Sequence, residues 1–390
     1  MKKGYGHTLA AAYIGYIVQS MVINFPPLLF AAFSEQFHIS VTGISLLISI
    51  NFCTQLVTDL AAARYINKIG YRRGAVLAHL FAVAGFLLLS FLPFVIPAYA
   101  GLCISTVIMA IGGGLTEVVI SPIVQELPLK NKASHMSLLH SFFCWGFVMT
   151  VLLSTAFFAL FGIDNWRYLA LLFSVIPFCG LVMFFYVPLV EQKNTESQTG
   201  SRKLLATPAF LLMLLMMLCG GASEIAMSQW ASYFAQLGLD VTKTVGDLLG
   251  PCSFAVLMGL ARLFFAKNEK RINLNTALII SSVLCIVSYL LAGLSPFPVL
   301  SLIGCSLCGL SVGLMWPGTL SLCAERFPSG GGKMFAMLAF AGDVGCVLGP
   351  FLLGVLSDLT GDLKIGILFV IIFPVIMLSG LIKEKLKNVG

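Results

Sequence analysis

The chain has 390 residues, of which 59% are hydrophobic and only 10% are charged. Soluble domains carry about 25% charged residues, so this composition excludes an ordinary soluble protein and indicates a chain that spans a lipid bilayer. The net charge of +7 follows from the membrane topology described below, and we expect no nucleic-acid partner.

Twelve apolar segments of spanning length, about 20 residues or more, follow one another along the chain. They cover residues 8–33, 41–63, 74–94, 98–124, 136–161, 166–189, 207–236, 243–266, 274–294, 297–323, 333–357 and 363–382. The only long polar stretch, "VEQKNTESQTGSRKLLAT", separates the sixth segment from the seventh. We therefore expect an all-α membrane protein with twelve transmembrane helices in two six-helix bundles. The bundles would comprise residues 1–190 and 207–390, joined by a cytoplasmic linker, residues 191–206.

The two halves of the chain resemble each other at a separation of about 200 residues. "QELPLKNKASHMSLLHSF" follows the fourth segment and "AERFPSGGGKMFAMLAF" follows the tenth, and each places a proline in a charged loop ahead of a methionine. Bilayer helices also resemble one another by composition alone, but the matched loops favour a true repeat. Repeats of six helices are typical of transporters that open alternately to the two sides of a membrane, so we expect two pseudo-symmetric bundles.

The basic residues predict the orientation of the spans. If both termini are cytoplasmic, the outer loops keep only Arg167, Lys243 and Lys364 of the 23 Lys and Arg residues. Cytoplasmic loops are enriched in Lys and Arg. We therefore predict a multi-pass protein of the plasma membrane, of the bacterial inner-membrane type, with both termini in the cytoplasm. We expect a monomer.

Four carboxylates fall within the predicted spans: Asp59, Glu117, Glu224 and Asp343. A charge at bilayer depth costs several kcal/mol, so such residues are functional candidates. Asp59 lies near the inner end of its span, where it could pair with Arg64. We expect Asp59 and Arg64, together with Arg262 near another inner end, to act in gating. Asp343 lies among small residues and could either bond a neighbouring helix or take part in proton coupling.

Glu117 and Glu224 are the stronger candidates for proton coupling and solute binding. Glu117 shares a helix face with Ser121, four residues later. Glu224 follows Gly220 and Gly221, which favour a bend there. Either acid could instead simply bond a neighbouring helix.

His140, in the span after Glu117, lies at a matching depth. A histidine beside a carboxylate titrates near neutral pH, so we include it in both the proton and the solute site. The alternative is a neutral histidine bonded to a backbone carbonyl. Glycines 112–114, just before Glu117, are expected to allow close contact with another helix.

Aromatic and amide side chains within the spans are candidates for binding the solute. Tryptophan offers a flat apolar face and one N–H donor, and amides bond hydroxyl groups. These candidates are Trp145, Trp230, Trp316, Gln19, Asn24, Asn51, Gln55 and Gln229. An anionic solute calls for a deep arginine, and none is expected, so a neutral polar solute is favoured. Trp166 is expected at the outer membrane boundary, as a belt residue.

These features resemble the major facilitator superfamily over the whole chain. "ARYINKIGYRRG" is similar to the signature loop between the second and third helices of that superfamily, and "GDVGCVLGPFLLG" is similar to its glycine-proline pattern in helix eleven. "TEVVISP" followed by "MSLLHSFFCWG" is similar to the fucose permease branch. That resemblance implies proton symport of a sugar, with Glu117 in the sugar and proton site and His140 lining the cavity.

The chain departs from that branch in its first helix. The branch carries an Asn-Asp pair there, whereas this chain reads "VINFPPLLF", which keeps Asn24 and has no acid. A proton step that needs the missing acid would have to use another residue, and Glu224 is the candidate.

We therefore predict a secondary active transporter that moves a small, neutral, sugar-like solute together with protons by alternating access. One alternative is a proton-driven exporter of amphipathic drugs or metabolites, because 31 Phe and 15 Met residues could line an apolar pocket. A receptor on a transporter fold is another.

No nucleophile, metal or cofactor pattern is present in the sequence, so we expect no enzyme, no cofactor and no metal. The expected partners are the solute, the proton and the lipid bilayer.

Overall fold

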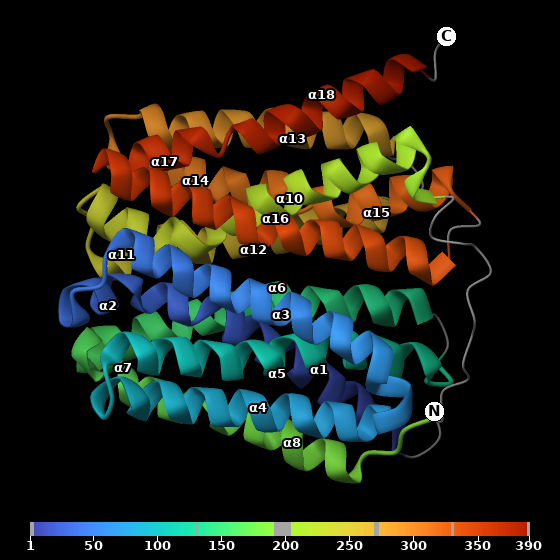
Figure 1. The fold of residues 1–390 in the computed structure, drawn as a ribbon, viewed down its shortest axis with the longest axis horizontal. Helices are drawn as coiled ribbons and strands as arrows, with labels where there is room; N and C mark the ends of the chain where they lie inside the picture. Colours follow the sequence, from blue (N-terminus) through green and yellow to red (C-terminus); the bar gives the residue numbers. More distant parts are fainter. Residues whose placement is uncertain (1–3, 130–131, 191–203, 269–272, 329–330, 388–390) are drawn as a thin grey trace. The chain divides into compact units, whose positions relative to one another are not determined.

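The computed structural model describes residues 4–129, 132–190, 204–268, 273–328 and 331–387. Within these ranges the regular structure is helical (Figure 1), and twelve segments are long and apolar enough to cross a membrane. Each segment corresponds to one of the twelve predicted from the sequence, so the all-α fold class is confirmed.

The first six spans are built from eight α-helices and three short 3-10 turns. These elements are α1 (Tyr5–Asn24), η1 (Pro26–Leu29), α2 (Phe30–Phe37), α3 (Val41–Ile69), α4 (Tyr71–Phe91), η2 (Leu92–Phe94), α5 (Ala98–Glu126), α6 (Lys132–Phe161), η3 (Ile163–Asn165), α7 (Trp166–Phe173) and α8 (Val175–Tyr186). Proline explains the first break, because Pro26 and Pro27 cannot donate to the helix of α1.

The last six spans contain nine α-helices and two π-helical turns in the described ranges. These elements are α10 (Pro208–Tyr233), η4 (Phe234–Gly238), α11 (Lys243–Asp247), η5 (Leu248–Cys252), α12 (Ser253–Asn268), α13 (Leu274–Leu294), α14 (Pro298–Val312), α15 (Met315–Arg326), α16 (Gly331–Thr360), α17 (Leu363–Phe369) and α18 (Ile372–Lys387). Gly220 and Gly221 do not break the helix, because α10 runs through both. A methyl group at Gly221 would strike the carbonyl of Gly342, so this glycine serves close packing against α16.

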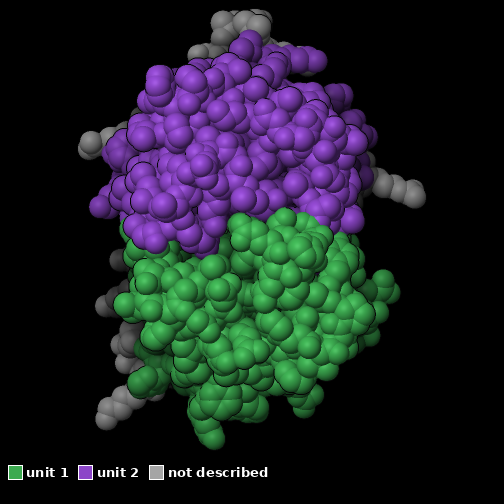
Figure 2. Space-filling model, turned by 90° about the vertical axis from the view of Figure 1, so that its left-hand side faces the viewer, with its two compact units in different colours: residues 1–39, 50–194 green, residues 40–49, 195–390 purple. Residues whose placement is uncertain are grey.

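The chain divides into two compact units, coloured separately in Figure 2. Unit 1 comprises residues 1–39 and 50–194, and unit 2 comprises residues 40–49 and 195–390. The short segment 40–49 joins unit 2 through α16: Thr42 donates its hydroxyl to Asp358, and Ser45 lies against Gly354.

The loop predicted around residues 64–73 is almost entirely helical. α3 continues to Ile69 and α4 begins at Tyr71, so Gly70 alone makes the turn, with φ of 87°. This left-handed conformation suits glycine. The prediction was wrong because hydropathy marks the edge of the bilayer, whereas a helix can continue into the polar region beyond it.

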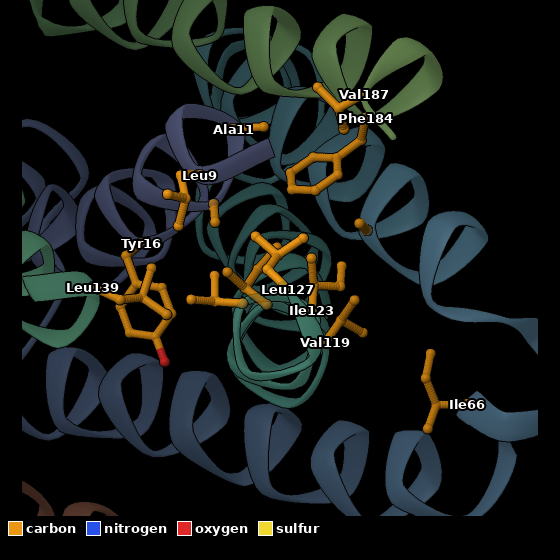
Figure 3. Packing of buried hydrophobic residues seen from close by; sticks show 14 residues of the cluster. Leu9, Ala11, Tyr16, Ile66, Val119, Ile123, Leu127, Leu139, Phe184 and Val187 are labelled. Carbon is orange, nitrogen blue, oxygen red and sulfur yellow. The ribbon is translucent and has the colours of Figure 1, made fainter. Parts of the chain in front are cut away.

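The interior of unit 1 is an apolar cluster contributed mainly by α1, α5, α6 and α8 (Figure 3). Val119 and Ile123 of α5 lie at its centre with Leu127, which directly follows α5, and Tyr16 and Leu139 approach from α1 and α6. The close helix contact predicted for glycines 112–114 is confirmed at Gly112 and Gly114 but not at Gly113, where a methyl group would make only an ordinary contact. A methyl group at Gly112 would lie 2.8 Å from the backbone nitrogen of Ala82 in α4.

Trp166 is a buried residue and not the predicted membrane-belt residue. It is fully buried, its ring centroid lies 5.3 Å from that of Phe33 and 5.6 Å from that of Phe94, and its indole N–H donates to Gln36 Oε1 at 3.0 Å. α2 extends the first span far enough to supply both the aromatic contact and the acceptor, so the indole is satisfied inside unit 1.

Candidate functional site

The strongest candidate site in unit 1 is centred on Glu117 of α5. Its Oε2 accepts one hydrogen bond from Gln19 Nε2 of α1 at 2.8 Å and one from Gln55 Nε2 of α3 at 3.0 Å. Three helices that are distant in sequence therefore meet at one carboxylate. Among the described residues, no basic side chain forms an ion pair with Glu117.

Two oxygen atoms at this site have no hydrogen-bond donor in the described part of the chain. Both amides donate to Oε2 of Glu117, which leaves Oε1 without a bond. Gln19 is 4% exposed, and its buried Oε1 also has no partner. Buried polar atoms are normally satisfied. The site therefore presents two acceptors to a ligand that brings hydrogen-bond donors.

A second polar contact lies one helical turn beyond Glu117. The Tyr16 hydroxyl and Ser121 Oγ are 2.6 Å apart, and the His140 ring meets the Tyr16 ring edge-on with centroids 5.2 Å apart. His140 therefore joins the cluster around Glu117 through Tyr16 and Ser121. Tyr16 was missed from the sequence, although the spacing of three residues between Tyr16 and Gln19 places both on one face of α1.

Asp59 does not form the predicted pair with Arg64. A methyl group at Gly114 would lie 2.6 Å from Asp59 Oδ1, so this carboxylate faces α5 close to Glu117. Arg64 is exposed, its guanidinium lies 5.9 Å from the Tyr65 ring, and it forms no ion pair within the described ranges. The residues are five apart, so they point to different faces of α3.

In unit 2, Glu224 of α10 forms an ion pair with Arg262 of α12. Arg262 Nη2 lies 3.2 Å from Oε1 and 3.3 Å from Oε2 of Glu224, and Arg262 Nε donates to the carbonyl of Gly313 at 3.4 Å. That carbonyl falls in the break between α14 and α15. The sequence did not predict this pair, because it placed Arg262 near the end of its span, away from Glu224. The backbone of Arg262 lies about 9 Å from the end of α12, and its long side chain reaches inward from there.

Comparison with known proteins decides the family. Residues 12–350 match the family model described as Major Facilitator Superfamily. This chain belongs to the major facilitator superfamily. It is therefore a secondary transporter that works by alternating access, and it belongs to a family of transporters and not of enzymes. Members bind small-molecule substrates within a membrane.

Solved structures show the same fold. One is a bacterial homologue of the human lysosomal transporter Spinster, in an inward-facing and occupied conformation. It shares 13% identity and a TM-score of 0.80, over 98% of this chain and 97% of that one. Another is the transporter FucP in the outward conformation, with 13% identity and a TM-score of 0.67, over 96% of this chain and 97% of that one. No curated protein matched the sequence.

Two residues predicted to bind the solute, Trp230 and Asn24, make hydrogen bonds inside their own bundles. Trp230 is 1% exposed and donates its indole N–H to the carbonyl of Pro350 at 3.0 Å. Asn24 donates to the carbonyl of Ser20 in its own helix at 2.9 Å. The indole N–H of Trp230 is therefore occupied, whereas the amide oxygen of Asn24 still offers an acceptor, and their roles in solute binding stay predictions.

The remaining candidates fall into two groups by exposure. Gln229 and Asn51 are buried, at 2% and 9% exposure. Trp316 packs its ring against Gly342 of α16, beside the partly buried Asp343. Trp145 is 38% exposed, and it alone of the predicted tryptophans offers a substantial free face.

A buried ion pair at the start of α11 was missed. Lys243 Nζ lies 2.7 Å from Asp247 Oδ2, and Ser232 Oγ donates to Asp247 Oδ1 at 2.5 Å. Asp247 is fully buried. The sequence reading assigned Lys243 to an outer loop and overlooked Asp247. The spacing of four residues between opposite charges was the available signal.

Proposed function

We propose that this transporter moves a small, polar, sugar-like solute together with protons, and that Glu117 is the proton-binding group. The observation that carries the proposal is the environment of Glu117. Its carboxylate is held by two neutral amides and has no ion-pair partner in the described part of the chain. A buried charge without a counter-charge is costly, and a proton removes that charge without moving any helix.

The same geometry supports a solute rich in hydroxyl groups. Glu117 Oε1 and Gln19 Oε1 both lack donors among the described residues, and a pair of sugar hydroxyls would supply them. The Tyr16 and Ser121 hydroxyls nearby can both donate and accept. Loss of the hydroxyl that bonds Gln19 Oε1 would leave this buried acceptor without a donor, which gives strong discrimination.

The test is Glu117→Gln, which replaces the carboxylate by a permanently neutral side chain of the same shape. We expect the variant to exchange labelled solute across vesicles but to lose accumulation driven by a proton gradient. Solute-driven alkalinisation outside energised cells should also disappear. Glu126→Gln is the matched control, because Glu126 is an exposed acid on the same helix. Accumulation by Glu117→Gln at the level of the control would reject the proposal.

A second candidate function is the proton-driven export of amphipathic organic cations. The observation that favours it is the same lack of a basic partner at Glu117, together with the aromatic rings of Tyr16 and Tyr13 nearby, the latter stacked on Phe142. A carboxylate beside aromatic rings attracts cations. Competition separates the two functions: free sugars should block transport in the first case, and hydrophobic cations should block it in the second.

A further inference from the structure

The Glu224–Arg262 pair in unit 2 has features that a purely structural ion pair would not need. Close, two-pronged pairs between arginine and carboxylate have N–O distances of about 2.7–2.9 Å. Here one nitrogen, Nη2, serves both oxygens of Glu224 at 3.2 and 3.3 Å. Both of these contacts are longer than those of a close pair, which would favour displacement of Glu224 by another carboxylate.

The side chains of Arg262 and Glu224 also differ in their exposed fraction. The side chain of Arg262 is 22% exposed, whereas that of Glu224 is 10% exposed. The Nε of Arg262 is fixed by the carbonyl of Gly313 in the break between α14 and α15. The guanidinium is thus anchored from its backbone side while part of it remains accessible.

We propose that Arg262 is a binding residue for an anionic group on the transported solute, and that Glu224 is the counter-ion that this group displaces. The proposal deepens the function proposed above, on which it rests, because it names a chemical group of the solute: a carboxylate. It replaces the expectation of a neutral solute, which was based on the amide side chains and on the absence of a deep arginine. The fork of five N–H donors on arginine suits a carboxylate better than it suits a neutral hydroxyl.

If a ligand competes with Glu224 for Arg262, substitutions of these two residues should have opposite effects on the affinity for that ligand. Glu224→Gln removes the competing charge and leaves Arg262 in place, so it should strengthen anion binding. Removal of Arg262 should abolish it. A structural pair would instead weaken binding in both variants, because loss of either partner leaves the other buried without a counter-charge.

The experiment measures binding to purified protein in detergent by thermal shift and calorimetry. The probes are two acids with their neutral counterparts: glucuronate with glucose, and benzoate with benzyl alcohol. We expect wild type to bind at least one acid better than its counterpart. We expect Glu224→Gln to bind that acid at least about threefold more tightly, and Arg262→Gln to lose the preference.

A double variant, Glu224→Gln with Arg262→Gln, guards against misfolding, because it leaves no buried charge at this pair. We expect it to stay folded and to bind acid and neutral counterpart alike. The proposal is overturned if Glu224→Gln binds acids no better than wild type, or if no variant prefers an acid. Neither result touches proton coupling at Glu117, which the vesicle assay measures separately.

Discussion

Glu117 in unit 1 and Glu224 in unit 2 are the same side chain, placed within an apolar helix in both cases and stabilised in opposite ways. Two neutral amides hold Glu117, and an arginine holds Glu224. The first arrangement offers no counter-charge and leaves two acceptors without donors in the described residues, whereas the second pairs the carboxylate with a cation. The difference indicates that the two acids have different tasks.

The comparison also separates what each site can bind. A site with a negative charge and empty acceptors calls for a proton or for hydroxyl donors. A site that holds an ion pair calls for a ligand that can replace one partner. What each site can bind therefore depends on the side chains that contact its carboxylate, and not on the carboxylate alone.

The largest expected effect comes from breaking the ion pair. Arg262→Gln leaves Glu224 buried without a counter-charge, and loss of one partner of a buried pair costs about 3–5 kcal/mol of stability. Thermal unfolding in detergent should show a large fall in Tm for this variant. The double variant with Glu224→Gln should recover most of it. Equal instability of the single and double variants would show that the charge is not what matters.

A smaller effect is expected where α3 and α5 meet beside Glu117. A methyl group at Gly114 would lie 2.6 Å from Asp59 Oδ1 and 3.1 Å from the carbonyl of Gln55. Gly114→Ala should push α3 away and lengthen the bond between Gln55 and Glu117. Overpacking of this kind costs about 1–3 kcal/mol, and transport should fall with it.

Gly113→Ala is the matched control for that change. A methyl group there would meet only Val22 Cγ1 at 3.5 Å, which is an ordinary contact. Solute uptake and Tm measured side by side should separate the two variants. If both behave like wild type, the amide of Gln55 does not depend on this helix contact.

The sequence predicted the spans well because the bilayer sets their length and composition, and Glu117 and Glu224 stood out because charge is rare there. It could not predict their partners. Gln19 and Gln55 come from helices distant along the chain, and the reach of Arg262 depends on its rotamer and on a break in another helix. Helix ends were also missed, as at Gly70, because helices continue beyond the apolar region.

The smallest expected effect tests whether Glu117 of unit 1 depends on a nearby basic residue. Arg64 was predicted to pair with Asp59, yet it is exposed and forms no ion pair in the described ranges. Arg64→Gln should therefore leave Tm and solute uptake unchanged. Arg72 is the informative contrast, because it donates to the carbonyls of Phe184, Phe185 and Val187 at 2.7–2.9 Å at the end of α8.

Arg72→Gln should lower Tm measurably, since it leaves these terminal carbonyls without their charged donor. It should affect the stability of unit 1 and not the proton dependence of transport. If Arg64→Gln instead changed the proton dependence of uptake, the carboxylates near Glu117 would rely on a basic partner after all. Glu117 could then no longer be contrasted with Glu224 as an acid that is held by amides alone.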